Sequence, residues 1–210
     1  MKKALVMAVA VVMAAMGLQA QIPAEVTNVM NKCRAAMNNP AGLEYVMDMK
    51  SSMGPVKLLD MNIVNGSKGE KSKSIITMKV LGQEIIMEAG FDGTQEWDAD
   101  QDTVIITKTT KRKKDKTDLQ LEPDKKYRKA RMKEKDDFYE IVFTDPIDRQ
   151  NEAKKITAKV SKKNYYIREI KSGARGATVN MTISKIRIGL KDDYFKLDLG
   201  KYPNAVVVKK

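Results

Sequence analysis

The sequence predicts a mainly β protein of antiparallel strands preceded by one helix. From Leu43 onward, apolar and polar residues alternate with a period of two, which is typical of strands with one apolar face. Turn signals such as Gly54-Pro55 and Asp92-Gly93 interrupt the alternation about every ten residues. After the apolar stretch Ala4–Leu18, an apolar stripe of helical period is present only in the segment just before Leu43.

The first twenty residues have the organisation of a signal peptide. Lys2 and Lys3 precede an almost unbroken apolar stretch from Ala4 to Leu18, and Ala20 offers a small residue at the cleavage position. The stretch is short for a membrane span. We therefore expect cleavage near Ala20, export to the periplasm, and a mature chain of one domain, residues 21–210.

Composition excludes several kinds of chemistry. The chain has no His, so His-based metal sites and Ser-His or Cys-His nucleophile pairs are excluded. Its single Cys excludes an internal disulfide. No other activated nucleophile or base is recognisable, and the sequence predicts a protein without cofactor or enzyme activity.

Residues 22–39 are predicted to form the helix. Five apolar residues at helical spacing make one stripe along it: Val26, Val29, Met30, Cys33 and Met37. The helix-breaking run from Asn38 to Gly42 ends it. Because Cys33 lies on the stripe, we expect its thiol to be buried.

The first strands are predicted at residues 43–50, 59–63, 76–80, 85–91 and 104–107, with a short strand around Trp97. Asn65-Gly66 is interpreted as a turn that opens a polar loop to Lys73. Ten of the 14 Met lie after residue 20, and six of them fall in or beside these strands: Met47, Met49, Met53, Met61, Met78 and Met87. Met suits surfaces that repack around varied apolar partners, although an ordinary core is the alternative.

Trp97, the only Trp of the chain, lies between two tight turns. Its large apolar ring and its N–H suit the edge of a cavity, and equally suit a core anchor for the helix. The acidic turn that follows, with Asp98, Asp100 and Asp102, resembles the first half of a calcium loop. It lacks the Gly and the Glu of such a loop, so no metal site is predicted.

Residues 108–137 form a charged excursion in which residues 124–135 suit a polar helix. A solvated loop is the simplest interpretation. The basic run Lys111, Arg112, Lys113 and Lys114 also suits an anionic lipid surface or an acidic envelope partner. Nucleic acid is not predicted as a partner, because Tyr127 is the only aromatic residue that this excursion offers for stacking on bases.

The remaining strands are predicted at residues 138–144, 156–160, 165–171, 177–188 and 194–197. The segment from Tyr202 to Val208 closes the chain.

The order of these features resembles the outer-membrane lipoprotein carrier (LolA-like) family, in the layout of its periplasmic Bacteroidetes-type members. The resemblance is carried by the Asp92-Gly93…Trp97 hairpin and by the stretches ITAKV, YYIREIKS, VNMTISKI and YFKLDLGKYPNAVVV. It implies a curved, open antiparallel sheet, a half-barrel, whose concave face is covered by the N-terminal helix and by the charged excursion. It further implies a non-enzymatic carrier or chaperone for lipoprotein acyl chains or another apolar ligand. An envelope sensor of the sigma-E regulator type, binding lipid or peptide, is the alternative.

A half-barrel cannot bury its apolar inner face against itself, and the predicted helix covers only part of it. We therefore expect a hydrophobic cavity lined by Met47, Met49, Met61, Met78, Ile85 and Met87, with Trp97 at its edge. Strand register decides whether these residues face together, because a slip of one residue turns a strand outward. The sequence does not distinguish a carrier from a sensor, nor name the ligand.

Overall fold

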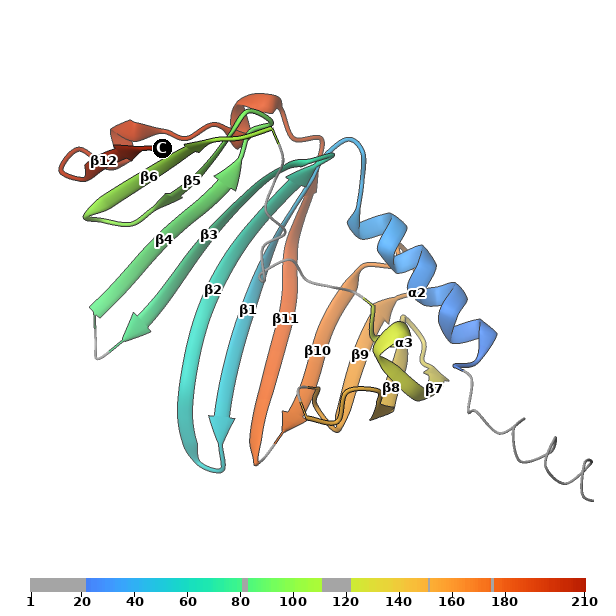
Figure 1. Ribbon diagram of the computed structural model, residues 1–210. Coiled ribbons are helices and arrows are strands. Elements are labelled where there is room, and N and C mark those ends of the chain that lie inside the picture. The colour runs from blue at the N-terminus through green and yellow to red at the C-terminus, as the bar shows by residue number, and fades with distance from the viewer. Residues whose placement is uncertain (1–21, 81–82, 111–121, 151, 175) are drawn as a thin grey trace, which may run out of the picture.

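The computed structural model describes residues 22–80, 83–110, 122–150, 152–174 and 176–210, which form one sheet of twelve strands with a helix on one face (Figure 1). The predicted signal peptide and the basic run Lys111–Lys114 lie outside these residues. The helices are α2 (Ala24–Met37), α3 (Pro123–Lys126) and the short 3-10 helices η1 (Asp192–Phe195) and η2 (Leu199–Lys201). The strands are β1 (Leu43–Met53), β2 (Val56–Lys68), β3 (Lys71–Val80), β4 (Gln83–Phe91), β5 (Gln95–Ala99), β6 (Thr103–Lys108), β7 (Tyr127–Glu134), β8 (Phe138–Pro146), β9 (Lys155–Ser161), β10 (Ile167–Ala174), β11 (Ala177–Ile188) and β12 (Val206–Lys209).

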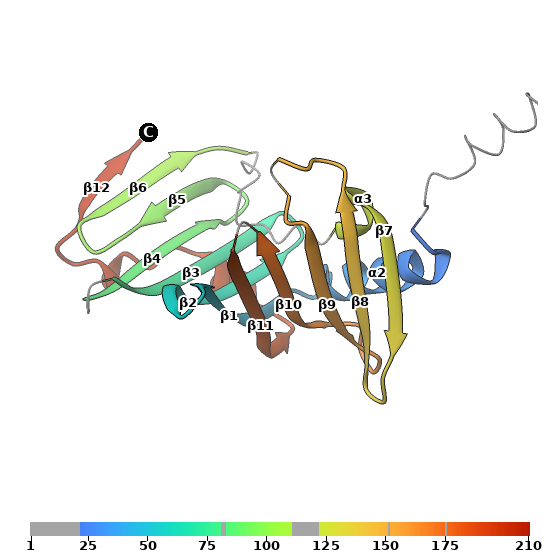
Figure 2. The same cartoon turned by 90° about the horizontal axis from the view of Figure 1, so that it is seen from below.

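The strand order is β12-β6-β5-β4-β3-β2-β1-β11-β10-β9-β8-β7. The chain meanders from β1 to β6, continues to the far edge at β7, and returns strand by strand until β11 pairs with β1. Every neighbouring pair is antiparallel except β12 and β6. The sheet is open and curls towards the side on which α2 lies (Figures 1 and 2). The predicted class, a mainly β protein with a curved open sheet and an N-terminal helix, is confirmed.

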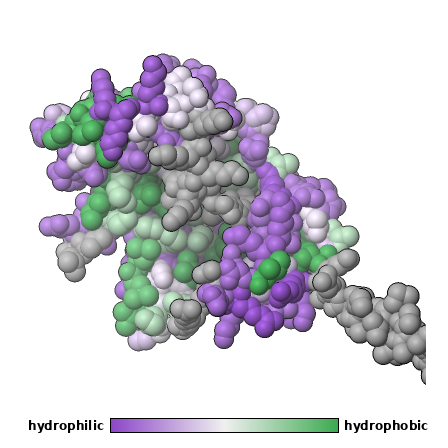
Figure 3. Space-filling model, viewed as in Figure 1, coloured by the Kyte–Doolittle hydropathy of each residue, from purple (hydrophilic) through white to green (hydrophobic). Residues whose placement is uncertain are grey.

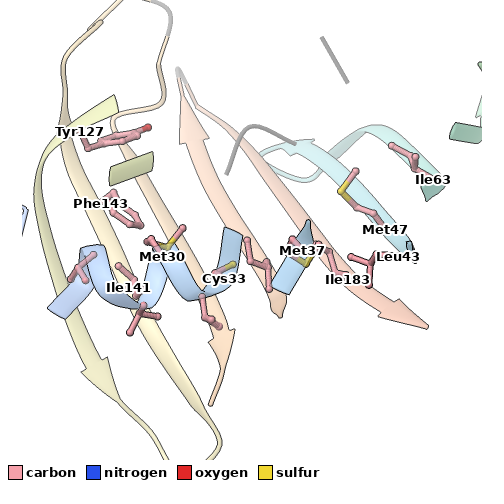
Figure 4. Packing of buried hydrophobic residues seen from close by; sticks show 14 residues of the cluster. Met30, Cys33, Met37, Leu43, Met47, Ile63, Tyr127, Ile141, Phe143 and Ile183 are labelled. Carbon is pink, nitrogen blue, oxygen red and sulfur yellow. The ribbon is translucent and has the colours of Figure 1, made fainter. Parts of the chain in front are cut away.

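Helix α2 packs its apolar stripe on the sheet as predicted. All five residues of the stripe are buried, and Cys33 is completely inaccessible. Figure 4 shows Met30, Cys33 and Met37 against side chains of the strands, among them Phe143, Ile183 and Leu43. We call this side of the sheet the helix face; it is the concave one.

The predicted helix at residues 124–135 is wrong. Only the turn α3 is helical, and the chain then runs as edge strand β7. Ala130 and Met132 of this strand pair with Phe143 and Ile141 of β8 and pack against the core. The local sequence favours a helix, but burying these two alternate side chains requires a strand, and tertiary packing decides.

Two further predictions are wrong for a shared reason. Asn65-Gly66 is no turn, because β2 continues to Lys68 and the chain turns at Gly69. Tyr194–Leu197 is no strand, because Tyr194 and Phe195 belong to η1. The Tyr194 ring lies on Gly66, where an added Cβ would come within 2.3 Å of the ring, so Gly66 provides space for packing.

None of the helices in the described part of the chain is long and apolar enough to cross a membrane.

Candidate functional site

An apolar row crosses nine neighbouring strands on the helix face. Residues directly opposite each other in an antiparallel sheet point to the same side, so register identifies the members of a row. We call the following set the apolar row: Met132, Ile141, Ala158, Ile170, Met181, Met49, Met61, Met78 and Ile85, on strands β7, β8, β9, β10, β11, β1, β2, β3 and β4. Every member is apolar.

A second row lies one pleat away on the same face. It joins Ile183, Met47, Ile63, Ile76 and Met87 across β11, β1, β2, β3 and β4. The structure therefore brings together six of the predicted cavity residues, Met47, Met49, Met61, Met78, Ile85 and Met87, on one face.

Among these six residues, Met47 is buried, Ile85 is exposed, and the other four are half-buried. Met47 is buried in the cluster formed with α2, and Met49 and Met61 pack partly against that cluster. Met78, Ile85 and Met87 do not belong to it, and Ile85 is 38% exposed. Along β2, β3 and β4 the apolar rows thus extend beyond the surface that α2 needs for its own packing.

Trp97 lies on the opposite face. Register joins Gly66, Lys73, Gly90 and Trp97 across β2, β3, β4 and β5, and these positions alternate with those of the apolar rows. The indole lies directly on Gly90, where an added Cβ would be 2.3 Å from the ring. Trp97 is 1% exposed, so the structure places it in a local core, neither at the edge of the predicted cavity nor beneath α2.

The segment after β11, residues 191–205, covers this opposite face; we call it the C-terminal segment. Lys73 forms a buried ion pair of 2.9 Å with Glu88 and donates a hydrogen bond to the Lys196 carbonyl. Tyr202 donates its hydroxyl to Glu88 at 3.2 Å. Burial and the neighbouring Glu88 raise the pKa of Tyr202 to about 12, so the hydroxyl stays a donor at neutral pH.

A clamp that sequence reasoning missed holds α2 to α3. The Arg34 guanidinium donates to both oxygens of Asp124, at 2.7 and 3.0 Å. The hydrogen bond to this carboxylate raises the pKa of Arg34. Arg34 stands on the polar side of the predicted helix and Asp124 lies 90 residues away, so nothing in the local pattern connects them.

Between β2 and β3 the sheet opens into a hollow of about 390 Å³ at the end where pairing of these strands stops. Its lining combines apolar and polar side chains: Leu58, Leu59, Met78, Lys57, Asp60, Asn62, Thr77 and Lys79. Met78, a member of the apolar row, borders the hollow, whereas Asn62 and Thr77 pair with each other on the opposite face.

The acidic turn serves the backbone. The Asp100 carboxylate accepts hydrogen bonds from the N–H groups of Asp102 and Thr103, as in an Asx turn. Within the described ranges, no group of three or more Cys, Asp or Glu side chains is arranged to hold a metal ion.

The sequence matches no protein-family model and no curated protein sequence. Among solved structures, this chain is similar to an uncharacterized conserved protein from Thermus thermophilus, with a TM-score of 0.54 and 6% identity over 89% of this chain and 99% of that one. A LolA superfamily protein from Nitrosomonas europaea matches with a TM-score of 0.37 and 12% identity, over 81% of this chain and 97% of that one. A putative outer membrane lipoprotein-sorting protein domain from Vibrio parahaemolyticus matches with a TM-score of 0.36 and 11% identity, over 80% of this chain and 95% of that one.

The Thermus protein shows that the fold occurs in a second, distant sequence. The architecture described above, an open curved sheet with a helix on its concave face, is the one that the resemblance to the LolA-like family implies. The Bacteroidetes-type assignment stays a prediction.

Proposed function

We propose that this protein is a non-enzymatic carrier that binds acyl chains of a lipid or lipoprotein on the helix face, in the periplasm. The observation that carries the proposal is the apolar row, which leaves the cluster under α2 at Met61 and continues through Met78 to the exposed Ile85. Apolar side chains that no packing within the described part of the chain requires are typical of an apolar binding surface.

The residue types suit a transient ligand. Each buried methylene contributes roughly 0.8 kcal/mol, so a chain that is only partly buried is held firmly. The flexible thioethers of Met61, Met78 and Met87 adapt to chains of different shape without selecting one. These properties favour a carrier, which must also release its ligand.

Two neighbouring residues provide a matched test. Ile85 and Ile86 are 38% and 37% exposed and point to opposite faces of β4. In Ile85→Asp a carboxylate enters the row and must lose hydration against hydrocarbon, so affinity for a fluorescent fatty-acyl probe should fall about tenfold or more. Ile86→Asp carries the same charge at the same exposure and should bind the probe like the wild type.

Met61→Asp tests the inner part of the site and should abolish probe binding, with circular dichroism as the check of folding. Equal loss of affinity in Ile85→Asp and Ile86→Asp, or unchanged binding in folded Met61→Asp, would place the ligand elsewhere. If this protein has a higher affinity for an extended apolar peptide than for the acyl probe, the result would fit the alternative function, an envelope sensor.

A further inference from the structure

Exposed apolar side chains gather at one end of the sheet. Met53, Val56 and Leu58, on the hairpin that joins β1 and β2, are 50%, 56% and 50% exposed. Ile85 and Ile86 add to them at the start of β4. In the space-filling view this hairpin forms an apolar projection at the lower left (Figure 3).

Strand lengths explain the projection. Met61 is the first residue of β2 that pairs with β3, so residues 56–60 of β2 pair only with β1. Pairing with β1 skips from Leu59 to Lys57, which leaves Leu58 as the extra residue of a bulge. The hairpin therefore extends beyond β3 and β4 (Figure 1). The bulge adds one more exposed apolar side chain, that of Leu58.

Lysines accompany the apolar side chains. Lys57 lies between Val56 and Leu58, Lys50 pairs with Asp60 across the hairpin, and Lys79 lines the adjoining hollow. The hydrogen bond from Lys57, with the charges of Lys50 and Lys79, lowers the pKa of Asp60. Three ammonium groups thus lie around the Asp60 carboxylate, and Glu84, opposite Lys79 on β4, is the second carboxylate nearby. Cations exceed anions by one among these five residues, which leaves this end of the sheet weakly positive.

We propose that the β1–β2 hairpin, with Met53, Val56 and Leu58 at its tip, docks on the surface of a lipid bilayer that contains anionic lipids. This inference rests on the proposed function, because it makes the hairpin the place where acyl chains pass between bilayer and carrier. The apolar row reaches solvent at Ile85, at the same end of the sheet, and the hollow between β2 and β3 adjoins both.

The chemistry of the hairpin favours a bilayer over a protein partner. The apolar groups lie on a narrow projection and not in a groove, so they can enter an acyl layer without matching a shape. Lysines placed just behind them can extend their ammonium groups to the phosphates of the head groups. A second copy of the chain would bring the same positive charge to this contact.

Flotation with vesicles tests the proposal. The wild type should float with vesicles of phosphatidylcholine and phosphatidylglycerol, and more weakly with phosphatidylcholine alone. Leu58→Asp should lose most of this binding, whereas Ile188→Asp, equally exposed at 49% but paired with Leu43 at the other end of β1, should keep it. The double variant Lys50→Gln with Lys79→Gln should bind the anionic vesicles more weakly and should bind the phosphatidylcholine vesicles like the wild type.

The acyl probe separates this proposal from the proposed function. Leu58→Asp should still bind the probe in solution, and Met61→Asp should still float although it has lost the probe. Val56→Asp serves as a second tip variant should Leu58→Asp fold poorly. The docking surface is refuted if both tip variants float like the wild type, or if Ile188→Asp loses vesicle binding as strongly as Leu58→Asp. It is also refuted if size-exclusion chromatography shows a wild-type dimer that becomes a monomer in Leu58→Asp.

Discussion

The two halves of the sheet bury opposite faces. Around β1 and β7–β11, helix α2 covers the helix face, and the core consists of its stripe with residues such as Leu43 and Phe143. Around β3–β6, the C-terminal segment covers the other face, where Trp97 lies on Gly90 and Lys73 pairs with Glu88. One continuous sheet thus has two cores on opposite sides.

This change of side explains why the apolar row continues where α2 no longer covers it. In the helix half, the row supplies the core. In the C-terminal half, stability comes from the opposite face, so Met78, Ile85 and Met87 are free to serve another purpose. The comparison indicates how stabilising contacts on one face of a sheet can leave apolar side chains on the other face for the proposed ligand.

Removing the Glu88 carboxylate should have the largest effect. Glu88→Ala leaves the Lys73 ammonium buried without its ion-pair partner, at a cost of about 3–5 kcal/mol in the free energy of unfolding, measured by urea denaturation. The control Glu134→Ala breaks an exposed pair with Lys162 and should cost no more than about 1 kcal/mol. Similar costs for the two variants would mean that the C-terminal half has no buried core of its own.

Filling the space above Gly90 should have the next largest effect. In Gly90→Ala the new methyl group displaces the Trp97 ring, at a cost of about 1–3 kcal/mol, and should shift the emission of the only Trp to longer wavelength. Gly173→Ala is the strand control, because its methyl group would meet only the Ala177 carbonyl at 3.8 Å. An unchanged emission spectrum in Gly90→Ala would contradict this packing.

The helix half is sensitive at Cys33. Cys33→Ser places a hydroxyl with little chance of a partner in the stripe of α2, which should cost about 1–3 kcal/mol in urea denaturation. The native thiol should react with a bulky reagent only as fast as the protein opens. Rapid labelling of the folded protein would show that α2 leaves the sheet readily.

Ionisation of the Cys33 thiol should have a smaller effect on the free energy of unfolding. Burial raises the pKa of the thiol from 9.0 to about 12, because the buried thiolate would lose its hydration. The unfolded chain therefore ionises first, so this contribution to stability is complete below pH 9 and is lost as pH rises from there to about 12. At pH 10 the loss relative to Cys33→Ala should be about 1 kcal/mol in urea denaturation; identical pH profiles would contradict it.

Local patterns in the sequence predicted the parts of the molecule whose partners are near in the chain. The stripe of α2 and the alternation of β1–β4 follow from periodicity, and the hydrogen bonds that Asp92 accepts from the N–H groups of Thr94 and Gln95 follow from turn chemistry. The six candidate residues on the helix face were recognisable because alternation alone assigns them to one side of each strand.

The sequence was misleading where a distant segment decides the outcome. Gly66 signals a turn, and only the ring of Tyr194, which follows much later in the chain, reveals that the glycine is there for close packing. Trp97 was assigned to the wrong side for the same reason, since the C-terminal segment that covers its face does not show in the local pattern. Arg34 and Asp124 meet only when the helix and the excursion pack together.

The smallest effect is expected at the surface contact of the C-terminal segment, where Asp192 accepts hydrogen bonds from Lys71 at 2.7 Å and Lys68 at 2.9 Å. These bonds and charges lower the pKa of Asp192 from 3.8 to about 2. Its contribution to stability is therefore present above pH 4 and is lost as pH falls towards 2, the reverse of Cys33. An NMR titration should find this low pKa, Lys71→Gln should raise it, and Lys191→Gln should leave it unchanged. Since Asp192 is solvated, added salt should also raise its pKa, whereas salt should not affect the desolvated Cys33. A salt-insensitive Asp192 would mean that the C-terminal segment, like α2, is held there by burial.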